Sequence, residues 1–306
     1  MTIILNDDHL KDHSFMSIAI NAVERAFISH TQGATVSPPR HHVSFGQHGD
    51  LVFTVGGALG EAPLAGFRVY DTFTGSEHTQ IVAVWSASDA KLKGLILGER
   101  LGAIRTGAIG GVAIKNLSAP EARTVGVIGS GLQARTQLAA AASVRNIALA
   151  KVYSRDETNR TAFAREMQTE LGIEVKPVSN VKDAVSNADI VICATCSSQP
   201  VITASDLKPG VHINTVGPKT LNAHELGVDV AGVAKIIATD SLAQTQAYAS
   251  PFFLHGSGHE QRIVELADIV AGRSLGRTSA EEVTLFCSVG LAGTEVVVAS
   301  AIFDSL

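Results

Sequence analysis

Cysteine, methionine and tryptophan are scarce in this chain of 306 residues, which has three cysteines, three methionines and one tryptophan. Because Cys193, Cys196 and Cys287 are few and odd in number, they cannot build a disulfide framework, and we expect a reduced, cytoplasmic protein. The 24 basic residues fall short of the 29 acidic ones, and no basic run occurs. This balance argues against nucleic acid and anionic membranes as partners.

Long apolar runs are also missing. No segment approaches the roughly 18 consecutive apolar residues of a membrane-spanning helix, so we expect no membrane span. The short apolar stretch near the N-terminus runs into acidic residues, which is not the pattern of a signal peptide. Hydrophobic residues make up 45% of the chain and charged residues 17%, a globular composition. At about 150 residues per domain, the length indicates two domains.

The pattern changes near Ser118-Ala119-Pro120. Before this point, apolar residues at helical spacing predict helices over residues 15–29 and 98–116. Between them, short and partly alternating segments predict strands at residues 42–45, 51–55, 66–70, 80–86 and 91–97. A strand-rich block with two flanking helices indicates an α+β domain over residues 1–117.

After this point, short apolar strands alternate with helices. Strands are predicted at residues 124–128, 150–154, 189–194, 212–216 and 235–239. Such alternation indicates an α/β fold, a doubly wound Rossmann domain with a parallel sheet, over residues 118–289. The last stretch, from Glu281 to about Phe303, reads as one long helix that could pack back on the first domain.

A glycine-rich loop lies between the first of these strands and a helix. It has the pattern G-x-G-x-x-A, in the residues Gly129, Ser130, Gly131, Leu132, Gln133 and Ala134. In a dinucleotide-binding fingerprint, the first glycine permits a tight turn and the second lets the backbone approach the pyrophosphate. The third position allows close packing of helix and strand, and the helix N-terminus offers free N–H groups to the anion. We therefore predict nucleotide binding at this loop.

The end of the next strand bears on the choice of cofactor. An acidic residue there would favour NAD, whereas arginine can hold the 2′-phosphate of NADP. The chain has Ser154-Arg155 at this place. A hydroxyl and a guanidinium suit a phosphate dianion, so NADP is predicted, with NAD as the alternative. A solvated loop arginine is the plainer interpretation of Arg155.

Cysteine and histidine patterns predict no metal site. Cys193 and Cys196 have C-x-x-C spacing, but they follow a predicted strand, and no second cysteine pair completes a zinc site. Packing is the favoured interpretation, and Thr195 is the better candidate for a cofactor contact. None of the eleven histidines has a metal-ligand spacing.

Together these residues carry a family likeness. The chain resembles the ornithine cyclodeaminase/mu-crystallin family over nearly its whole length, in Pro38-Pro39-Arg40, Gly66-Phe67-Arg68, His78-Thr79, Arg105-Thr106-Gly107-Ala108, the loop from Gly129 to Ala134, Ile213-Asn214-Thr215-Val216-Gly217 followed by Glu225-Leu226, and Phe286-Cys287-Ser288-Val289-Gly290-Leu291-Ala292. The resemblance implies a homodimer whose substrate-binding and dimerisation domain comprises residues 1–117 plus 290–306. It also implies reactions through imines of amino acids, and it adds Val216, Gly217 and Ser288 to the cofactor contacts.

Arginines are the predicted ligands of a small carboxylate-bearing imine or amino acid. A guanidinium pairs with a carboxylate through two parallel hydrogen bonds. Arg40, Arg68 and Arg105 fit an anionic substrate, although each alone could be a surface or structural arginine. The family likeness favours the substrate role for Arg40 and Arg105 and adds Thr79. Arg68 is also the candidate catalytic residue, although a guanidinium stays protonated and would orient a carboxylate rather than transfer protons.

Three departures from the family's cyclodeaminases bear on the reaction. Those enzymes have a lysine in place of Arg68, and an aspartate almost immediately after Gly217, where this chain has Pro218-Lys219. Their late Glu-Asp pair is replaced by Thr294-Glu295. The sequence thus favours an NAD(P)H-dependent reductase of a ketimine such as pyrroline-2-carboxylate. The alternatives are an ornithine cyclodeaminase that releases proline and ammonia, and a mu-crystallin-like binding protein without turnover.

Overall fold

The computed structural model describes residues 2–11, 14–75, 78–248 and 250–306. These form two compact units, residues 1–105 with 291–306, and residues 106–290. The sequence analysis placed the divisions after residues 117 and 289. In the structure the first division falls inside helix α2 (Arg100–Leu117), which runs without a break from one unit into the other.

A mostly antiparallel sheet forms the first unit. Its strand order is β1-β7-β6-β5-β4-β2, with β3 paired to β4, and only β1 joins in a parallel manner among the described strands. The strands are β1 (Ile3–Asn6), β2 (Thr35–Val36), β3 (His41–Ser44), β4 (Asp50–Ala58), β5 (Leu64–Asp71), β6 (Ile81–Ser86) and β7 (Lys91–Leu97). The expected α+β domain is therefore present, and its five predicted strands match β3 to β7.

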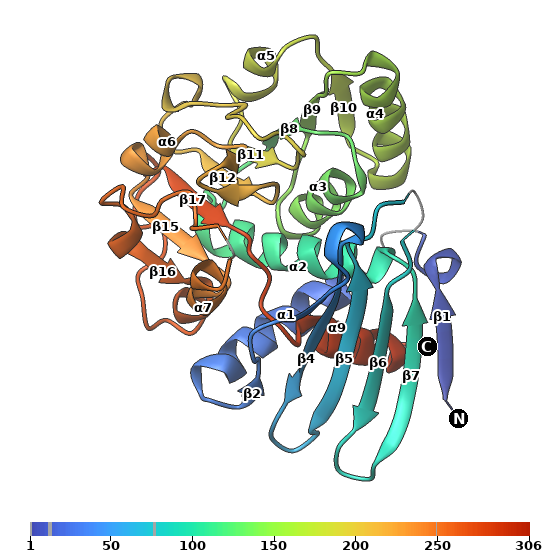
Figure 1. The fold of residues 1–306 in the computed structure, drawn as a ribbon. Coiled ribbons are helices and arrows are strands. Elements are labelled where there is room, and N and C mark those ends of the chain that lie inside the picture. Colours follow the sequence, from blue (N-terminus) through green and yellow to red (C-terminus); the bar gives the residue numbers. More distant parts are fainter. Residues whose placement is uncertain (1, 12–13, 76–77, 249) are drawn as a thin grey trace. The chain divides into compact units, whose positions relative to one another are not determined.

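Helix α9 (Thr294–Phe303) crosses one face of this sheet and also packs against α1 (Met16–Thr31) (Figure 1). Glycines on the strands allow α9 and the turn before it to lie close to the sheet. A Cβ at Gly66 would press against the side chain of Val296, and one at Gly56 would collide with the backbone at Gly293. Two short 3-10 helices, η1 (Asp7–Leu10) and η2 (Gly46–His48), complete the unit. The face under α9 is the one that carries the arginine described below.

The prediction of one long helix from Glu281 is wrong. Residues Thr284–Cys287 form strand β17, which is fully buried between two neighbouring strands. Gly290 and Gly293 follow with φ angles of +87° and +82°, and the helix begins only after them. Pairing with strands that are distant in sequence thus overrides a local pattern that suits a helix.

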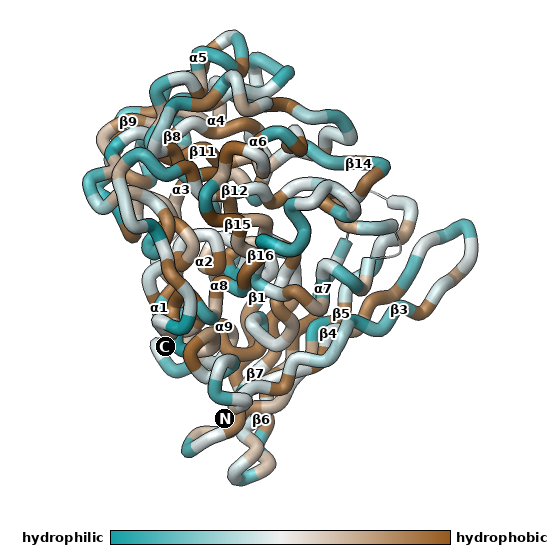
Figure 2. Tube along the Cα trace, turned by 90° about the vertical axis from the view of Figure 1, so that its left-hand side faces the viewer, coloured by the Kyte–Doolittle hydropathy of each residue, from teal (hydrophilic) through white to brown (hydrophobic). Residues whose placement is uncertain are grey.

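A parallel sheet forms the second unit, in the order β10-β9-β8-β11-β12-β17-β15-β16. Its strands are β8 (Thr124–Ile128), β9 (Leu149–Tyr153), β10 (Glu174–Pro177), β11 (Ile190–Cys193), β12 (His212–Thr215), β15 (Ile236–Thr239), β16 (Ile263–Glu265) and β17 (Thr284–Cys287). Figure 2 shows hydrophobic residues concentrated along β8, β11 and β12, as expected for strands covered on both faces. This confirms the doubly wound Rossmann sheet.

Helices and short segments connect these strands. They are α3 (Leu132–Val144), α4 (Glu157–Leu171), α5 (Val181–Val185), α6 (Val228–Val233), α7 (Leu242–Gln246), α8 (Leu266–Val270), the 3-10 turns η3 (Ala204–Asp206) and η4 (Glu260–Arg262), and the hairpin β13 (Lys219–Thr220) with β14 (Ala223–His224). The strand order reverses between β8 and β11. From β8 the chain continues to β9 and so towards one edge of the sheet, whereas from β11 it continues to β12 and so towards the other edge. In doubly wound folds, ligands bind outside the carboxyl ends of the strands at such a point.

Buried polar side chains tie α2 and α3 to this sheet. Asn214 on β12 donates to the carbonyl of Gly110 on α2 and to Oε1 of Gln137 on α3, both at 3.1 Å. His212 contacts Asn214 and Thr284 at 2.8 Å each. Burial lowers the pKa of His212 to about 3, so this imidazole is neutral and serves as a hydrogen-bonding spacer. The network joins α3, and the part of α2 that belongs to this unit, to strand β12.

Candidate functional site

The glycine loop has the geometry that its sequence predicts. Gly129 has a φ of +112°, and a Cβ there would collide with the carbonyl of Ala194. Gly131 is the N-cap of α3, and nothing lies within 4 Å of the place where its Cβ would be. Oε1 of Gln133 is buried without a hydrogen-bond partner among the described residues. The open backbone at the N-terminus of a 13-residue helix fits a pyrophosphate.

The other cofactor candidates lie at the same edge of the sheet. Because all the paired strands are parallel, their carboxyl ends share this edge. The candidates beyond these ends are Gly129-Ser130 after β8, Ser154-Arg155 after β9, Thr195 after β11, Val216-Gly217 after β12 and Ser288 after β17. The structure therefore places at one edge of the sheet candidates that are up to 159 residues apart in the sequence.

The loop after β9 presents one exposed arginine. Arg155 is exposed, whereas Arg160 donates to the carbonyl of Ser154 at 3.2 Å. An acidic residue is also near, but Asp156 is the N-cap of α4 and accepts from the backbone N–H of Asn159 at 2.8 Å. The carboxylate of Asp156 thus caps the N-terminus of α4 by accepting from one of its free N–H groups. The exposed group with phosphate-binding chemistry at this place is Arg155.

Glu225, which the sequence analysis did not assign to the site, organises two loops at the sheet edge. One carboxylate oxygen accepts from the N–H and the hydroxyl of Thr195, at 2.8 and 2.7 Å. The other accepts from the hydroxyl of Thr215 at 2.7 Å and from the N–H groups of Val216 and Gly217 at 3.1 and 2.6 Å. These donors at the predicted cofactor contacts are therefore bound inside the protein, and Glu225 determines the shape of the loops.

Lys219 is a second buried charge in this region. Its Nζ donates to the carbonyl of Gly217. Burial lowers its pKa, while the charge of Glu225 opposes that shift. Because Lys219 and Glu225 are buried, oppositely charged and interact, we interpret them as charges that compensate each other.

Two thiols of this unit, those of Cys193 and Cys287, have the features of packing groups. Cys193 and Cys287 are buried, and Cys196 is exposed. Burial raises the pKa of Cys287 to about 12 and that of Cys193 well above its usual value. A thiol held protonated is a poor nucleophile and a poor metal ligand. Burial of Cys193 agrees with the interpretation of the C-x-x-C spacing as packing, whereas the exposure of Cys196 does not.

Two of the predicted substrate arginines meet at one carboxylate in the first unit. Oε1 of Glu295, in the first turn of α9, accepts from Nη2 of Arg105 at 2.5 Å and from Nη1 of Arg68 at 2.9 Å. Arg68 also donates from Nε to Gln80 at 2.9 Å, and its Cζ lies 4.4 Å from the ring centre of Tyr70. Arg105 and Glu295 are buried, with 4% and 2% of their surface exposed. The sequence analysis noted Glu295 only as a departure from the family pattern.

The two remaining substrate candidates are more peripheral. Arg40 is half-buried in the segment before β3, and its charge contributes to lowering the pKa of Glu295. Thr79 is exposed in the connection between β5 and β6. The structure thus brings Arg68 and Arg105 together and leaves Thr79 as a prediction.

Metal-ligating side chains do not gather in the part of the chain that the structure describes: no three His, Cys, Asp or Glu residues there lie close enough to hold an ion. Among the described helices, none is both long and apolar enough to span a membrane.

A sequence model of the ornithine cyclodeaminase/mu-crystallin family matches residues 1–306. The chain belongs to this family. The resemblance inferred from the short motifs is thereby confirmed, and its fold class with it.

Relatives of known activity cover much of the chain. A Δ1-pyrroline-2-carboxylate reductase of Bacillus cereus is 36% identical over 218 residues, which is 69% of this chain and 66%, just under two thirds, of that relative. The structure of the Δ1-pyrroline-2-carboxylate reductase of Thermococcus litoralis, in complex with NADH and L-proline, has a TM-score of 0.88 and 31% identity, and covers 99% of this chain and 97% of its own. An archaeal alanine dehydrogenase dimer with bound NAD has a TM-score of 0.86 and 27% identity, over 99% and 95% of the two chains.

Proposed function

We propose that this member of the family is an NAD(P)H-dependent imine reductase that converts a small imino acid, such as pyrroline-2-carboxylate, to an amino acid. The observation that carries the proposal is the chemistry of the first unit's candidates. The side chains at Arg68, which is partly buried, and at Arg105, which is buried, are guanidiniums, which bind carboxylates but do not exchange protons at neutral pH. Imine reduction needs an oriented carboxylate and few protein acids.

The chain's residues would have separate tasks in this reaction. The N–H groups at the start of α3 would bind the pyrophosphate of the dinucleotide, and the loops shaped by Glu225 would border it. Arg40, Arg68 and Arg105 would hold the carboxylate next to the C=N bond. The nicotinamide cofactor, when bound, would supply the hydride to the C=N carbon, and the imine nitrogen would take a proton from water or a nearby acid. The protein's contribution is therefore orientation and electrostatics.

Assays with purified protein test this proposal against its alternatives. NADPH and NADH oxidation would be followed with Δ1-pyrroline-2-carboxylate and with imines formed from pyruvate and amines. We expect cofactor oxidation with at least one of them. Proline and ammonia formed from ornithine, without net change of the cofactor, would instead identify a cyclodeaminase. Tight cofactor binding with no turnover of any imine would identify a binding protein.

We expect a preference for NADPH over NADH, and Arg155→Ala should reduce it. The exposed guanidinium after β9 would lose a charge-assisted contact with the 2′-phosphate, so NADPH binding should weaken by about 1–3 kcal/mol while NADH binding changes little. Fluorescence titration measures both dissociation constants. The matched control is Arg165→Ala, because Arg165 is an exposed arginine on helix α4, which follows Arg155 in the chain. Equal affinities of the unmodified protein for the two cofactors would contradict the prediction.

We also expect a homodimer formed through the first unit's sheet. The face opposite α9 exposes apolar side chains, with 51% of Val55, 40% of Ile81 and 37% of Leu97 accessible. On the same face the rings of Phe67 and Trp85 lie 5.8 Å apart. Apolar strand faces of this kind are normally covered. Light scattering at micromolar concentration should give twice the chain mass of 31.9 kDa, and a monomer would count against this interface.

A further inference from the structure

Glu295 is a carboxylate that the protein itself places among its carboxylate-binding arginines. A single oxygen, Oε1, receives both Arg68 Nη1 and Arg105 Nη2. The three groups come from different elements, the arginines from β5 and α2 and the acid from the first turn of α9. Since Glu295 is buried, this arrangement is not an incidental surface ion pair.

The binding capacity of Arg68 is partly occupied by this arrangement. Its Nε donates to Gln80 and its Nη1 to Glu295, while its planar group stacks on Tyr70. A guanidinium binds a carboxylate through two parallel hydrogen bonds, which come from two neighbouring nitrogens on the same edge of the group. Two of the five N–H groups of Arg68 already donate inside the protein, one from each such edge. The two hydrogens of Nη2 and the second hydrogen of Nη1 are left for a further acceptor.

The charges of the cluster lead to the same conclusion. Burial opposes ionisation of Glu295, but the charges of Arg105 and Arg68, with a smaller contribution from Arg40, outweigh it and lower the pKa to about 2. The acid is therefore ionised at any working pH. Without Glu295, Arg68 and Arg105 would carry a combined charge of +2; the ionised Glu295 lowers it to +1, and Arg40 adds a further positive charge nearby.

We propose that Glu295 selects substrates with a single carboxylate, because it occupies the arginine positions that a second carboxylate would need. This inference rests on the proposed function and names its substrate class: imino acids with one carboxylate. A dicarboxylic imine would place its second anion against the buried carboxylate of Glu295. The resulting repulsion in a poorly solvated site costs binding.

Two stable ligands test this selection directly. Pyrrole-2-carboxylate has one carboxylate, and pyrrole-2,5-dicarboxylate has two on the same ring. Calorimetry with the full-length protein, saturated with oxidised cofactor, gives both dissociation constants. We expect the unmodified protein to bind the monocarboxylate about 10-fold or more tightly than the dicarboxylate. In Glu295→Gln, which keeps an oxygen for the arginines but removes the charge, this ratio should fall by about 10-fold.

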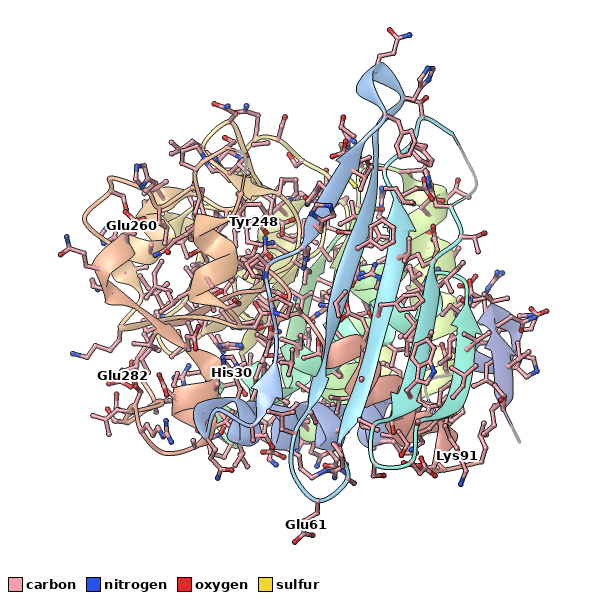
Figure 3. The ribbon with its side chains drawn as sticks, turned by 60° about the horizontal axis from the view of Figure 1, so that its bottom comes forward. His30, Glu61, Lys91, Tyr248, Glu260 and Glu282 are labelled. Atoms are coloured by element: carbon pink, nitrogen blue, oxygen red, sulfur yellow. The ribbon has the colours of Figure 1, made fainter. Side chains whose placement is uncertain are left out.

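Control variants separate selection from general damage to the site. Glu295→Asp keeps the charge and should keep the preference for the monocarboxylate. Glu61→Gln removes an exposed acid at the tip of the β4–β5 hairpin (Figure 3) and should change neither constant. If Glu295 had only a structural role, Glu295→Gln would weaken the binding of both ligands equally. The ratio of the two dissociation constants would then stay unchanged, and this result would overturn the proposal.

Other outcomes are equally decisive and need no variant. If the unmodified protein binds the dicarboxylate as tightly as the monocarboxylate, or binds neither, the inference is wrong. The reductase assay is independent of these titrations. Imine reduction without the binding preference would contradict the role of Glu295 alone, whereas no reduction of any imine would contradict the proposed function.

Discussion

Replacement of Arg105 by alanine should lower kcat/KM for imine reduction by about 100-fold or more, on the order of 3 kcal/mol. Arg105 is buried and lies 2.5 Å from Glu295, so its removal has two consequences. The substrate carboxylate loses a cationic partner. The carboxylate of Glu295 then depends on Arg68 alone, and an incompletely paired buried anion draws that guanidinium towards itself.

Steady-state kinetics at saturating cofactor measure this effect. Arg100→Ala is the matched control, because Arg100 begins the same helix and its Nη1 donates to the carbonyl of Lys11. Arg40→Ala should also lower kcat/KM. Arg68→Lys should keep part of the activity and leave the pH profile nearly unchanged, since position 68 binds rather than transfers protons. If Arg105→Ala and Arg40→Ala both turn over every imine normally, the arginines do not bind the substrate.

Replacement of Glu225 by alanine should be the most destabilising single change in the second unit, with a loss of about 4 kcal/mol or more in the free energy of unfolding. Five donors converge on this fully buried carboxylate. Each buried donor left without a partner costs about 1–3 kcal/mol, although such costs do not add fully. Lys219 would also become a buried cation without its nearby anion.

Urea unfolding followed by circular dichroism gives this loss. Glu225→Gln should cost less, because the amide oxygen still accepts some of the same donors. Glu281→Ala, an exposed acid of the same unit, should leave the unfolding midpoint unchanged. If Glu225→Ala unfolds at the urea concentration of the unmodified protein, the five hydrogen bonds do not contribute to stability as argued. Weaker cofactor binding is expected with the loss, since the same carboxylate shapes the loops at the sheet edge.

Local patterns were sufficient for much of this protein. The strand before Gly129, the helix after Gly131 and the alternation of strands and helices predicted the Rossmann unit, because turn geometry and hydrophobic periodicity are properties of short segments. The motifs around Arg40, Arg105 and Gly129 were specific enough to indicate the family, which the whole-chain match confirms. The edge strands β1 and β10 were not predicted from the sequence.

The tertiary structure alone decided which groups meet. Strand β17 was read as helix because its pairing partners, β12 and β15, lie 45 or more residues earlier in the chain. Glu295 and Arg68 are 227 residues apart, yet they form one buried ion pair. Glu225 belongs to a segment that matches the family, but its role became clear only from the five donors that the fold brings to it. Burial and long-range contacts determine what a charged side chain does, and neither is encoded in the residues beside it.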